Sequence, residues 1–365
     1  SNSGYAISTR GNENVKWESS TQADGGLDIG ILQDRLSLIV DYYVKTTSDM
    51  LIPVPLPLIG GSAAEPYVNA GKVQNKGLET ELDYRNDAGR LKYDISANFA
   101  TLKNKVLSLA DGSPIPGGRI DNGVYATLTT VGQPIGSFYL LEMEGIFQNE
   151  GDIFSHAYQG SYIKPGDVKF KDQNSDGVID EKDRTFLGSA IPKIIYGLTT
   201  NLSYGNFDLS IFFQGAYGNK IYMQVNQDIE GFYRAFNLTE RVYDERWTGD
   251  GTSNTMPRVS WLGSTNNKTP SSRFLEDASY LRLKNLQIGY NFPQSMMSKI
   301  HIQGLRIYVT GENLLTFTKY PGMDPEMHTS DNLKSETYQG DLAAGIDWGT
   351  YPSARSYIAG VNLTF

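Results

Sequence analysis

A run of acidic and amide residues between Asp172 and Asp183 carries the clearest chemical signal in this sequence of 365 residues. Its oxygen-bearing side chains stand at the offsets of a calcium-binding loop, with Gly177 at the sixth position, where such a loop turns sharply. Hard oxygen donors at these offsets can converge on one cation because the glycine lets the chain fold back. The predicted ligands are Asp172, Asn174, Asp176, the Val178 carbonyl, Asp180 and Asp183.

The ends of this run modify the prediction. Asp183 takes the twelfth position, where a bidentate glutamate is usual, and it is still a competent oxygen ligand. The flanking sequence does not predict a pair of helices, so we expect a structural calcium in a long loop, residues 166–188, and no conformational switch. The alternative is an acidic surface turn in which Asp and Asn side chains cap nearby backbone amides.

Catalytic constellations are not indicated elsewhere. His156, His301 and His328 are scattered, and neighbouring carboxylates such as Glu79 and Glu81 stand two residues apart within a predicted strand. That spacing favours carboxylates that face water from a strand over a hydrolase pair. The sequence has no cysteine, which excludes disulfides and thiolate chemistry. We therefore expect a protein that is not an enzyme.

The acidic run leads directly into a predicted hairpin. Residues 194–204 and 207–217 each alternate apolar residues with small or polar ones, and Gly205-Asn206 forms the turn between them. This alternation predicts two long antiparallel strands, each with one apolar and one polar face.

Similar alternation recurs along the chain and gives about eleven strands. The other segments are residues 27–31, 36–44, 78–84, 91–99, 127–131, 137–147, 286–292, 305–317 and 357–365. Mean hydropathy is −0.37, and no apolar run is long enough for a membrane helix. A transmembrane β-barrel has this composition because only every second strand residue meets lipid.

The predicted connections alternate between short turns and segments of tens of residues. In outer-membrane barrels the short turns are periplasmic and the long loops are extracellular, and single-chain bacterial barrels have an even number of strands. The odd count therefore predicts that residues 1–365 are the C-terminal portion of a larger all-β barrel, with a periplasmic C-terminus. The early strands would be missing or on another chain.

A secreted soluble β protein that binds calcium and carbohydrate remains an alternative, although strands of ten or more residues exceed the usual length in soluble proteins. A nucleic-acid partner is not expected, because the net charge is −9 and the sequence has no basic block.

Several ordered motifs resemble one family, the SusC/RagA-type TonB-dependent outer-membrane transporters of Bacteroidota. The matching stretches are residues 11–18 (GNENVKWE), 69–79 (NAGKVQNKGLE), 131–138 (VGQPIGSF), 166–170 (GDVKF) with the acidic run, 183–185, 192–193, 208–215, 279–285 (SYLRLKN), 311–314 (GENL), 351–352 and 360–365. These motifs extend over nearly the whole chain.

The resemblance implies a 22-stranded barrel with an N-terminal plug, of which this chain supplies about half the strands. It also implies import of oligosaccharides or peptides, a SusD-like surface lipoprotein as a lid, and energy from TonB acting on the plug. By this resemblance we expect the plug and the early strands to lie outside residues 1–365. The predicted loops Thr46–Asn75, Gly218–Ala278 and Thr318–Pro352 would contact the lid and the substrate.

Overall fold

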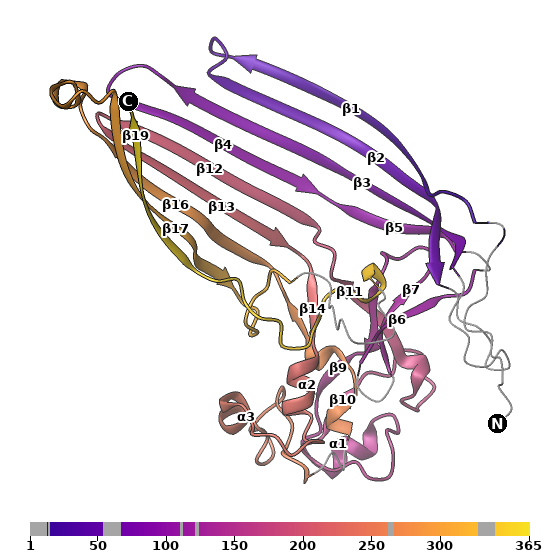
Figure 1. Cartoon of the computed structure of the whole chain (residues 1–365). Coiled ribbons are helices and arrows are strands. Elements are labelled where there is room, and N and C mark those ends of the chain that lie inside the picture. The colour runs from indigo at the N-terminus through magenta and orange to yellow at the C-terminus, as the bar shows by residue number, and fades with distance from the viewer. Residues whose placement is uncertain are drawn as a thin grey trace, which may run out of the picture.

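The computed structural model describes residue 13 and residues 15–53, 67–109, 112–120, 124–261, 266–327 and 340–365. Long antiparallel strands form one large sheet, and the connections at one of its ends fold into a separate compact region (Figure 1). We call this compact region the loop region. It comprises the described residues between β5 and β12, between β13 and β16, and between β17 and β19.

The large sheet contains ten described strands, and nine of them follow one another in chain order. These nine are β1 (Ser19–Ile31), β2 (Leu36–Pro53), β3 (Tyr67–Asn86), β4 (Leu91–Thr101), β12 (Ile194–Tyr204), β13 (Phe207–Tyr217), β16 (Tyr280–Asn291), β17 (Gly304–Thr318) and β19 (Ser356–Thr364). The tenth, β5 (Lys103–Ser108), continues β4 along the first half of β3. The strand-by-strand antiparallel order is that of an up-and-down barrel wall.

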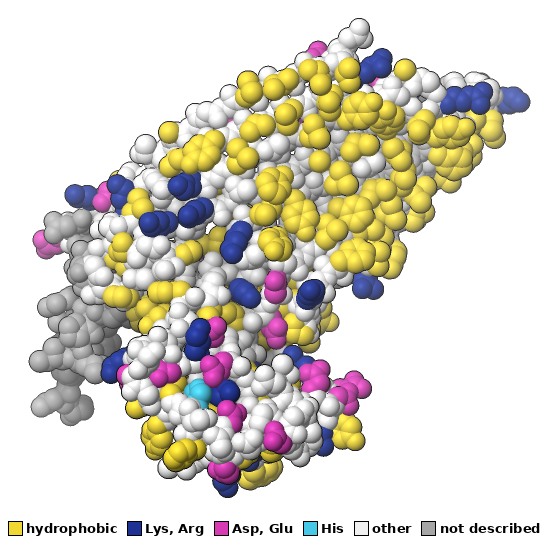
Figure 2. Space-filling view, turned by 180° about the vertical axis from the view of Figure 1, so that it is seen from behind, with side chains coloured by type: hydrophobic (Ala, Val, Ile, Leu, Met, Phe, Trp, Pro, Cys, Tyr) yellow, Lys and Arg dark blue, Asp and Glu magenta, His cyan; other side chains and the backbone are white. Residues whose placement is uncertain are grey.

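The strand register aligns the apolar positions of neighbouring strands into rows. One such row joins six strands through the successive pairs Ile29–Leu38, Leu38–Leu82, Leu82–Ala97, Ala97–Leu198 and Leu198–Phe213. None of the described strands covers this face, and Leu82 and Leu198 remain 43% and 38% exposed. A broad apolar band results (Figure 2). Exposed apolar area of this extent is rare on soluble monomers and is what lipid contact requires.

The opposite face of the sheet is polar. Asp83, Ser96 and Thr199 are register neighbours on it, and Ser210 donates a hydrogen bond of 2.8 Å to Asn201. Arg306 forms an ion pair with Asp208 on the same face. The sheet therefore has one apolar and one polar face, the arrangement of a wall between lipid and water.

The two ends of the sheet differ in the length of their connections. The turns at residues 32–35, 87–90 and 205–206 lie at the same end as the C-terminus (Figure 1). The connection from β16 to β17 at this end holds α4 (Gln294–Met297) and η7 (Ser298–Ile300). At Gly205 the backbone has φ 61°, so the two-residue turn uses a conformation that glycine adopts without strain.

The loop region contains three small sheets and several short helices. One sheet pairs β6 (Ile115–Arg119), β7 (Tyr125–Thr129), β8 (Ser137–Leu141) and β11 (Arg184–Ser189); another pairs β9 (Met143–Ile146) with β10 (Val168–Phe170); the third pairs β14 (Lys220–Met223), β15 (Leu275–Asp277) and β18 (Ile346–Asp347). The helices are α1 (Glu150–Ser155), α2 (Gln224–Glu230), α3 (Glu240–Glu245), η3 (Glu181–Asp183), η5 (Asn266–Lys268), η6 (Ser272–Phe274) and η8 (Gly340–Ala343). Phe138, Leu140, Tyr222, Phe274 and Ile346 are fully buried members of one of its hydrophobic clusters.

One hairpin that the sequence predicted in the barrel wall lies outside it. Residues 127–131 and 137–147 do pair, as β7 and β8, but in the loop region and not in the barrel wall. Strands of five residues span only about 17 Å, which is too short for an apolar band about 25 Å tall. Phe138 and Leu140 are fully buried, as a small packed core demands. The predicted number of barrel strands was therefore too high by the two strands of this hairpin. The nine strands that follow one another in the described sheet are still an odd number.

The predicted connection Thr46–Asn75 also needs correction. β2 continues to Pro53 and β3 begins at Tyr67, so all of its described residues belong to strands. Among the described residues, no helix is long and apolar enough to cross a membrane.

Candidate functional site

The acidic run lies in the loop region between β10 and β11. Its middle is held against the segment that follows α1, because Tyr158 donates its backbone N–H to the Gly177 carbonyl at 2.8 Å. Ile179 donates in turn to the Tyr158 carbonyl at 2.9 Å. Sequence reasoning did not identify Tyr158, which anchors the loop through its backbone and therefore leaves no pattern of side-chain types.

The loop folds back on itself as the calcium prediction requires. Asp172 accepts hydrogen bonds from the amides of Ser175 at 2.7 Å and Gly177 at 2.9 Å. Asp176 accepts from the Val178 amide at 3.0 Å, and Gly177 has φ 83°. The glycine is therefore at the sharp turn, in the left-handed conformation that disfavours other residues.

Asp183 joins the two ends of the loop. Its carboxylate accepts from the amide of Gln173 at 2.9 Å and from that of Asp180 at 2.8 Å, and its side chain is fully buried. Asp180 caps η3 by accepting from the Lys182 amide at 2.7 Å. Position twelve of the loop therefore contacts both position two and position nine.

The chemistry of these residues suits a hard divalent cation. Their donors are oxygens, and for the four carboxylates the nearest cationic partner in the described part is Lys182, 3.7 Å from Asp180. Among the residues that the structure describes, no three or more His, Cys, Asp or Glu side chains are gathered closely enough to hold a metal. The loop brings the predicted ligands into one turn of chain, with several carboxylates hydrogen-bonded to amides.

A buried ion pair next to this loop was not predicted. Asp167 is fully buried and accepts from the Arg258 guanidinium at 2.8 and 3.2 Å. The Asn267 side chain donates to the same carboxylate at 3.3 Å. The pair joins the connection that carries the acidic run to the connection between β13 and β16. Only the three-dimensional fold brings these two residues together, so the sequence pattern gave no signal.

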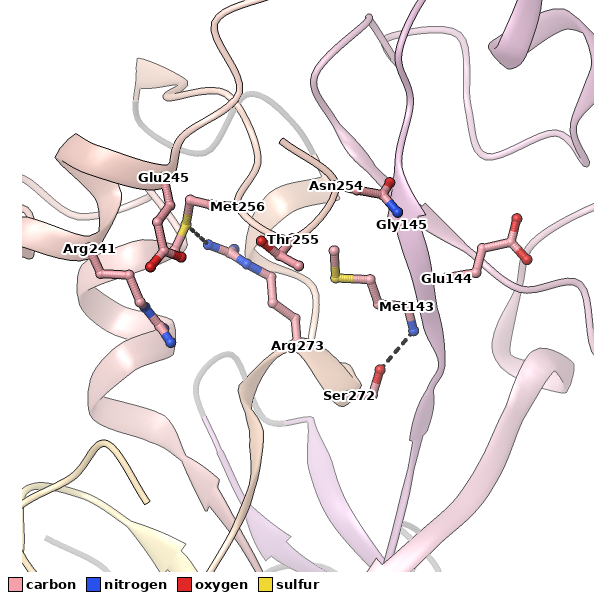
Figure 3. A pocket seen from close by; sticks show the side chains of 10 residues that line it. All are labelled: Met143, Glu144, Gly145, Arg241, Glu245, Asn254, Thr255, Met256, Ser272 and Arg273. Atoms are coloured by element: carbon pink, nitrogen blue, oxygen red, sulfur yellow. Dashed lines mark hydrogen bonds between the residues drawn. The ribbon is translucent and has the colours of Figure 1, made fainter. Parts of the chain in front are cut away.

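A cavity of about 430 Å³ opens between these two connections (Figure 3). It lies between β9 on one side and α3 with η6 on the other. Its lining residues are Met143, Glu144, Gly145, Arg241, Glu245, Asn254, Thr255, Met256, Ser272 and Arg273. The volume falls in the range of small-molecule sites, and the lining combines charged groups with flexible methionines.

Arg273 is the most unusual group in this cavity. Its guanidinium donates to the backbone carbonyls of Asn267 at 2.6 Å and Glu230 at 2.8 Å, and burial lowers the pKa of Arg273 to about 10. The buried carboxylate of Glu230 instead accepts from Arg241 and from the Thr239 hydroxyl. Both arginines of the cavity are therefore engaged by protein acceptors.

A third cluster attaches the connection after β17 to the sheet. Arg282 on β16 is buried and donates to both Asp324 and Glu326, and the Ser353 amide donates to Asp324 at 2.9 Å. Burial alone would raise the pKa of Asp324, but these hydrogen bonds hold it below the usual aspartate value. Lys284 completes the cluster at 2.6 Å from Glu326.

The structure describes only part of the loops that were predicted to contact the lid and the substrate. Residues 54–66, 262–265 and 328–339, which include His328, lie outside the described part of the chain. The described residues of Gly218–Ala278 form α2, α3, η5 and much of the cavity wall in Figure 3.

The comparisons with known proteins agree with this architecture. Residues 1–314 match the family model of the TonB-dependent receptor-like β-barrel. The TonB-dependent receptor P3 of Formosa agariphila is 35% identical over 99% of the chain, and the TonB-dependent receptor SusC of Bacteroides thetaiotaomicron is 27% identical over 97%. The solved RagAB peptide transporter matches 99% of the chain with a TM-score of 0.78 and 28% identity.

The chain spans about a third of the length of these proteins: 36% of P3, 32% of SusC and 37% of the matched RagAB chain. The family consists of receptors and transporters, not enzymes, and implies an outer-membrane location. The exposed apolar face counts against the secreted soluble alternative, which would need that face to be buried. The chain belongs to the TonB-dependent receptor-like β-barrel family and is of the SusC/RagA type.

Proposed function

We propose that this chain forms part of the wall and the outer loops of an outer-membrane importer of oligosaccharides or peptides. The observation that carries the proposal is the two-faced sheet, whose apolar rows run from strand to strand while the opposite face stays polar. Such a wall suits a water-filled passage through lipid. The protein would act by binding and gated passage, without chemistry on the substrate.

In this proposal the loop region is extracellular, and the short turns and the C-terminus are periplasmic. Long loops outside and short turns inside are the rule for bacterial barrels. A SusD-like lipoprotein would cover the loop region, and TonB would act through a plug that other residues of the whole protein supply. Phe154, Tyr243 and Trp261 support a partner surface, since they are 94%, 72% and 76% exposed and aromatic residues are enriched at interfaces.

The same proposal assigns the acidic run to a calcium ion. Asp172, Asn174, Asp176, the Val178 carbonyl, Asp180 and Asp183 would hold it, and the ion would supply positive charge to a loop that concentrates four carboxylates. The anchoring of Gly177 and Ile179 to Tyr158 supports a role as a brace, because rigidity gained in the loop would pass to the segment after α1.

Transport can be tested with the whole protein that contains this chain. Cells that carry it would be given labelled oligosaccharide and peptide mixtures, with and without a protonophore that removes the energy source of TonB. We expect uptake of one of the two classes, loss of uptake with the protonophore, and loss when the gene is disrupted. Equal uptake of both classes in intact and disrupted cells would contradict the proposal.

A further inference from the structure

A second cavity, of about 570 Å³, lies where the sheet meets the loop region. It opens where β5 separates from β12. The last contact between these segments is the hydrogen bond from the Leu102 amide to the Lys193 carbonyl, and Val106 pairs instead with Gln133. Phe186, Leu187 and Ile191 give the cavity an apolar wall.

Its polar lining is cationic. Lys103, Lys105, Lys193 and Lys220 line the cavity, and none of its described lining residues is a carboxylate. Within the described part of the chain, none of these lysines forms an ion pair. Lys220 has the register neighbour Asp277 on β15, so the uncompensated charge belongs chiefly to the other three.

The strand register places two of these lysines on the apolar face of the sheet. Phe99 pairs with Tyr196 on that face, and Lys103 and Lys105 follow Phe99 on the same side at the two-residue spacing of a strand. Lys103 also lies directly opposite Lys76 of β3. Like charges opposite each other destabilise a strand pair, so this arrangement favours an anionic neighbour.

The position of the lysines along the strand indicates which kind of anion the cavity would bind. On β4 the apolar side chains of this face run from Leu91 to Phe99, close to the length that crosses the bilayer core, and the lysines come next. Basic side chains gather at the boundary between the apolar band and the loop region (Figure 2). At this level a lipid presents its head group, while its chains lie against the band below.

We propose that this cavity binds the phosphate-bearing head group of a membrane lipid, with Lys103 and Lys105 as the principal phosphate contacts. Lys193 and Lys220 would complete the cationic wall, and the apolar wall would receive the first part of an acyl chain. The inference rests on the proposed membrane-spanning role of the sheet. It adds a specific lipid site to that role.

The test uses the whole transporter, purified in detergent and stripped of lipid. Native mass spectrometry would count adducts of phosphatidic acid and of diacylglycerol, which is the same lipid without the phosphate. We expect phosphatidic acid to bind and diacylglycerol not to bind. The double variant Lys103→Gln/Lys105→Gln should weaken phosphatidic acid binding by roughly tenfold or more, since each basic residue near a lipid surface contributes about 1 kcal/mol.

The matched control is Lys92→Gln/Lys299→Gln, which removes two lysines near the other end of the strands and should bind phosphatidic acid as the parent does. Equal binding by the parent and the Lys103/Lys105 variant would overturn the lipid site. If inorganic phosphate alone bound as tightly as phosphatidic acid, the proposal that the ligand is a lipid would be overturned. Liposome flotation separates these results from the larger proposal, because a parent protein that does not insert into liposomes contradicts the membrane-spanning role itself.

Discussion

Asp167 and Arg258 form a bidentate ion pair between two connections that are 91 residues apart in the sequence. The carboxylate is fully buried, whereas the guanidinium is partly exposed. A buried charge that loses its partner is costly, so this pair keeps the acidic loop and the β13–β16 connection in one fixed arrangement.

The first prediction concerns this pair. Arg258→Met should leave the Asp167 charge uncompensated and destabilise the loop region by about 3–5 kcal/mol. Hydrogen exchange of the whole transporter should then show faster exchange at β10 and η5, with the large sheet unchanged. The control is Lys171→Met, which breaks an exposed pair with Glu142 and should cost about 0–1 kcal/mol. Similar exchange in the two variants would show that Asp167 does not need Arg258.

The second prediction concerns calcium. Asp176→Ala should lower the calcium content of the purified transporter by about one ion and speed exchange at the Gly177 and Ile179 amides, as expected for a loop that loses its brace. Chelation should have the same effect on the parent protein. Asp250→Ala, in an exposed turn of the other connection, should leave both measurements unchanged. Unchanged calcium in the Asp176 variant would refute the site.

The third prediction concerns pH. The pKa of Asp324 is lowered in the folded protein, so its pairing with Arg282 stabilises the fold fully above the unfolded-state pKa of about 3.9. That stability is lost as the pH falls below this value and through the lower folded pKa. Acid titration followed by hydrogen exchange at the Glu326 and Ser353 amides should show this loss in the parent protein. Asp324→Asn removes this carboxylate and leaves Glu326 paired with Arg282 and Lys284, so the acid transition should become smaller, and a transition identical to that of the parent would contradict the assignment.

The fourth prediction compares the two faces of β12. Leu198→Lys places a charge on the apolar band, which should cost about 2–4 kcal/mol near the bilayer midplane. Thr199→Lys places the same charge on the polar face and should cost far less. Unfolding of the two variants in liposomes by urea would measure the difference. Equal stability of both variants would contradict a lipid-facing role for Leu198.

The sequence predicted those features that depend on local periodicity. Alternation along residues 194–217 gave the observed hairpin, because each of these strands has one environment per face and the turn needs only glycine's freedom. The hairpin at residues 127–147 was misplaced, since pairing is local but membership of a sheet is decided by distant contacts such as Tyr222 and Phe274 against Phe138. The calcium ligands stay a prediction from spacing, whereas the Asp167–Arg258 pair and the lysine-lined cavity depend on contacts between distant segments that spacing does not contain.

The irregular register at Lys284 has one further consequence. Pairing with β17 passes from Leu283 to Asn285 with a shift, so Leu283 and Leu286 both take the apolar side although they are three positions apart. The alternation of apolar and polar residues in β16 therefore shifts by one position at the bulge, and the apolar residues of both halves face the same side. Deleting one residue from a regular wall strand would turn one half of that strand inside out. Deleting Lys284 would instead remove the bulge and give β16 one continuous alternation of apolar and polar residues. Leu283 and Leu286 would then stand two positions apart and keep the apolar side, and Arg282 would keep the polar side, so the bulge is what lets one extra residue enter the strand without turning either half inside out.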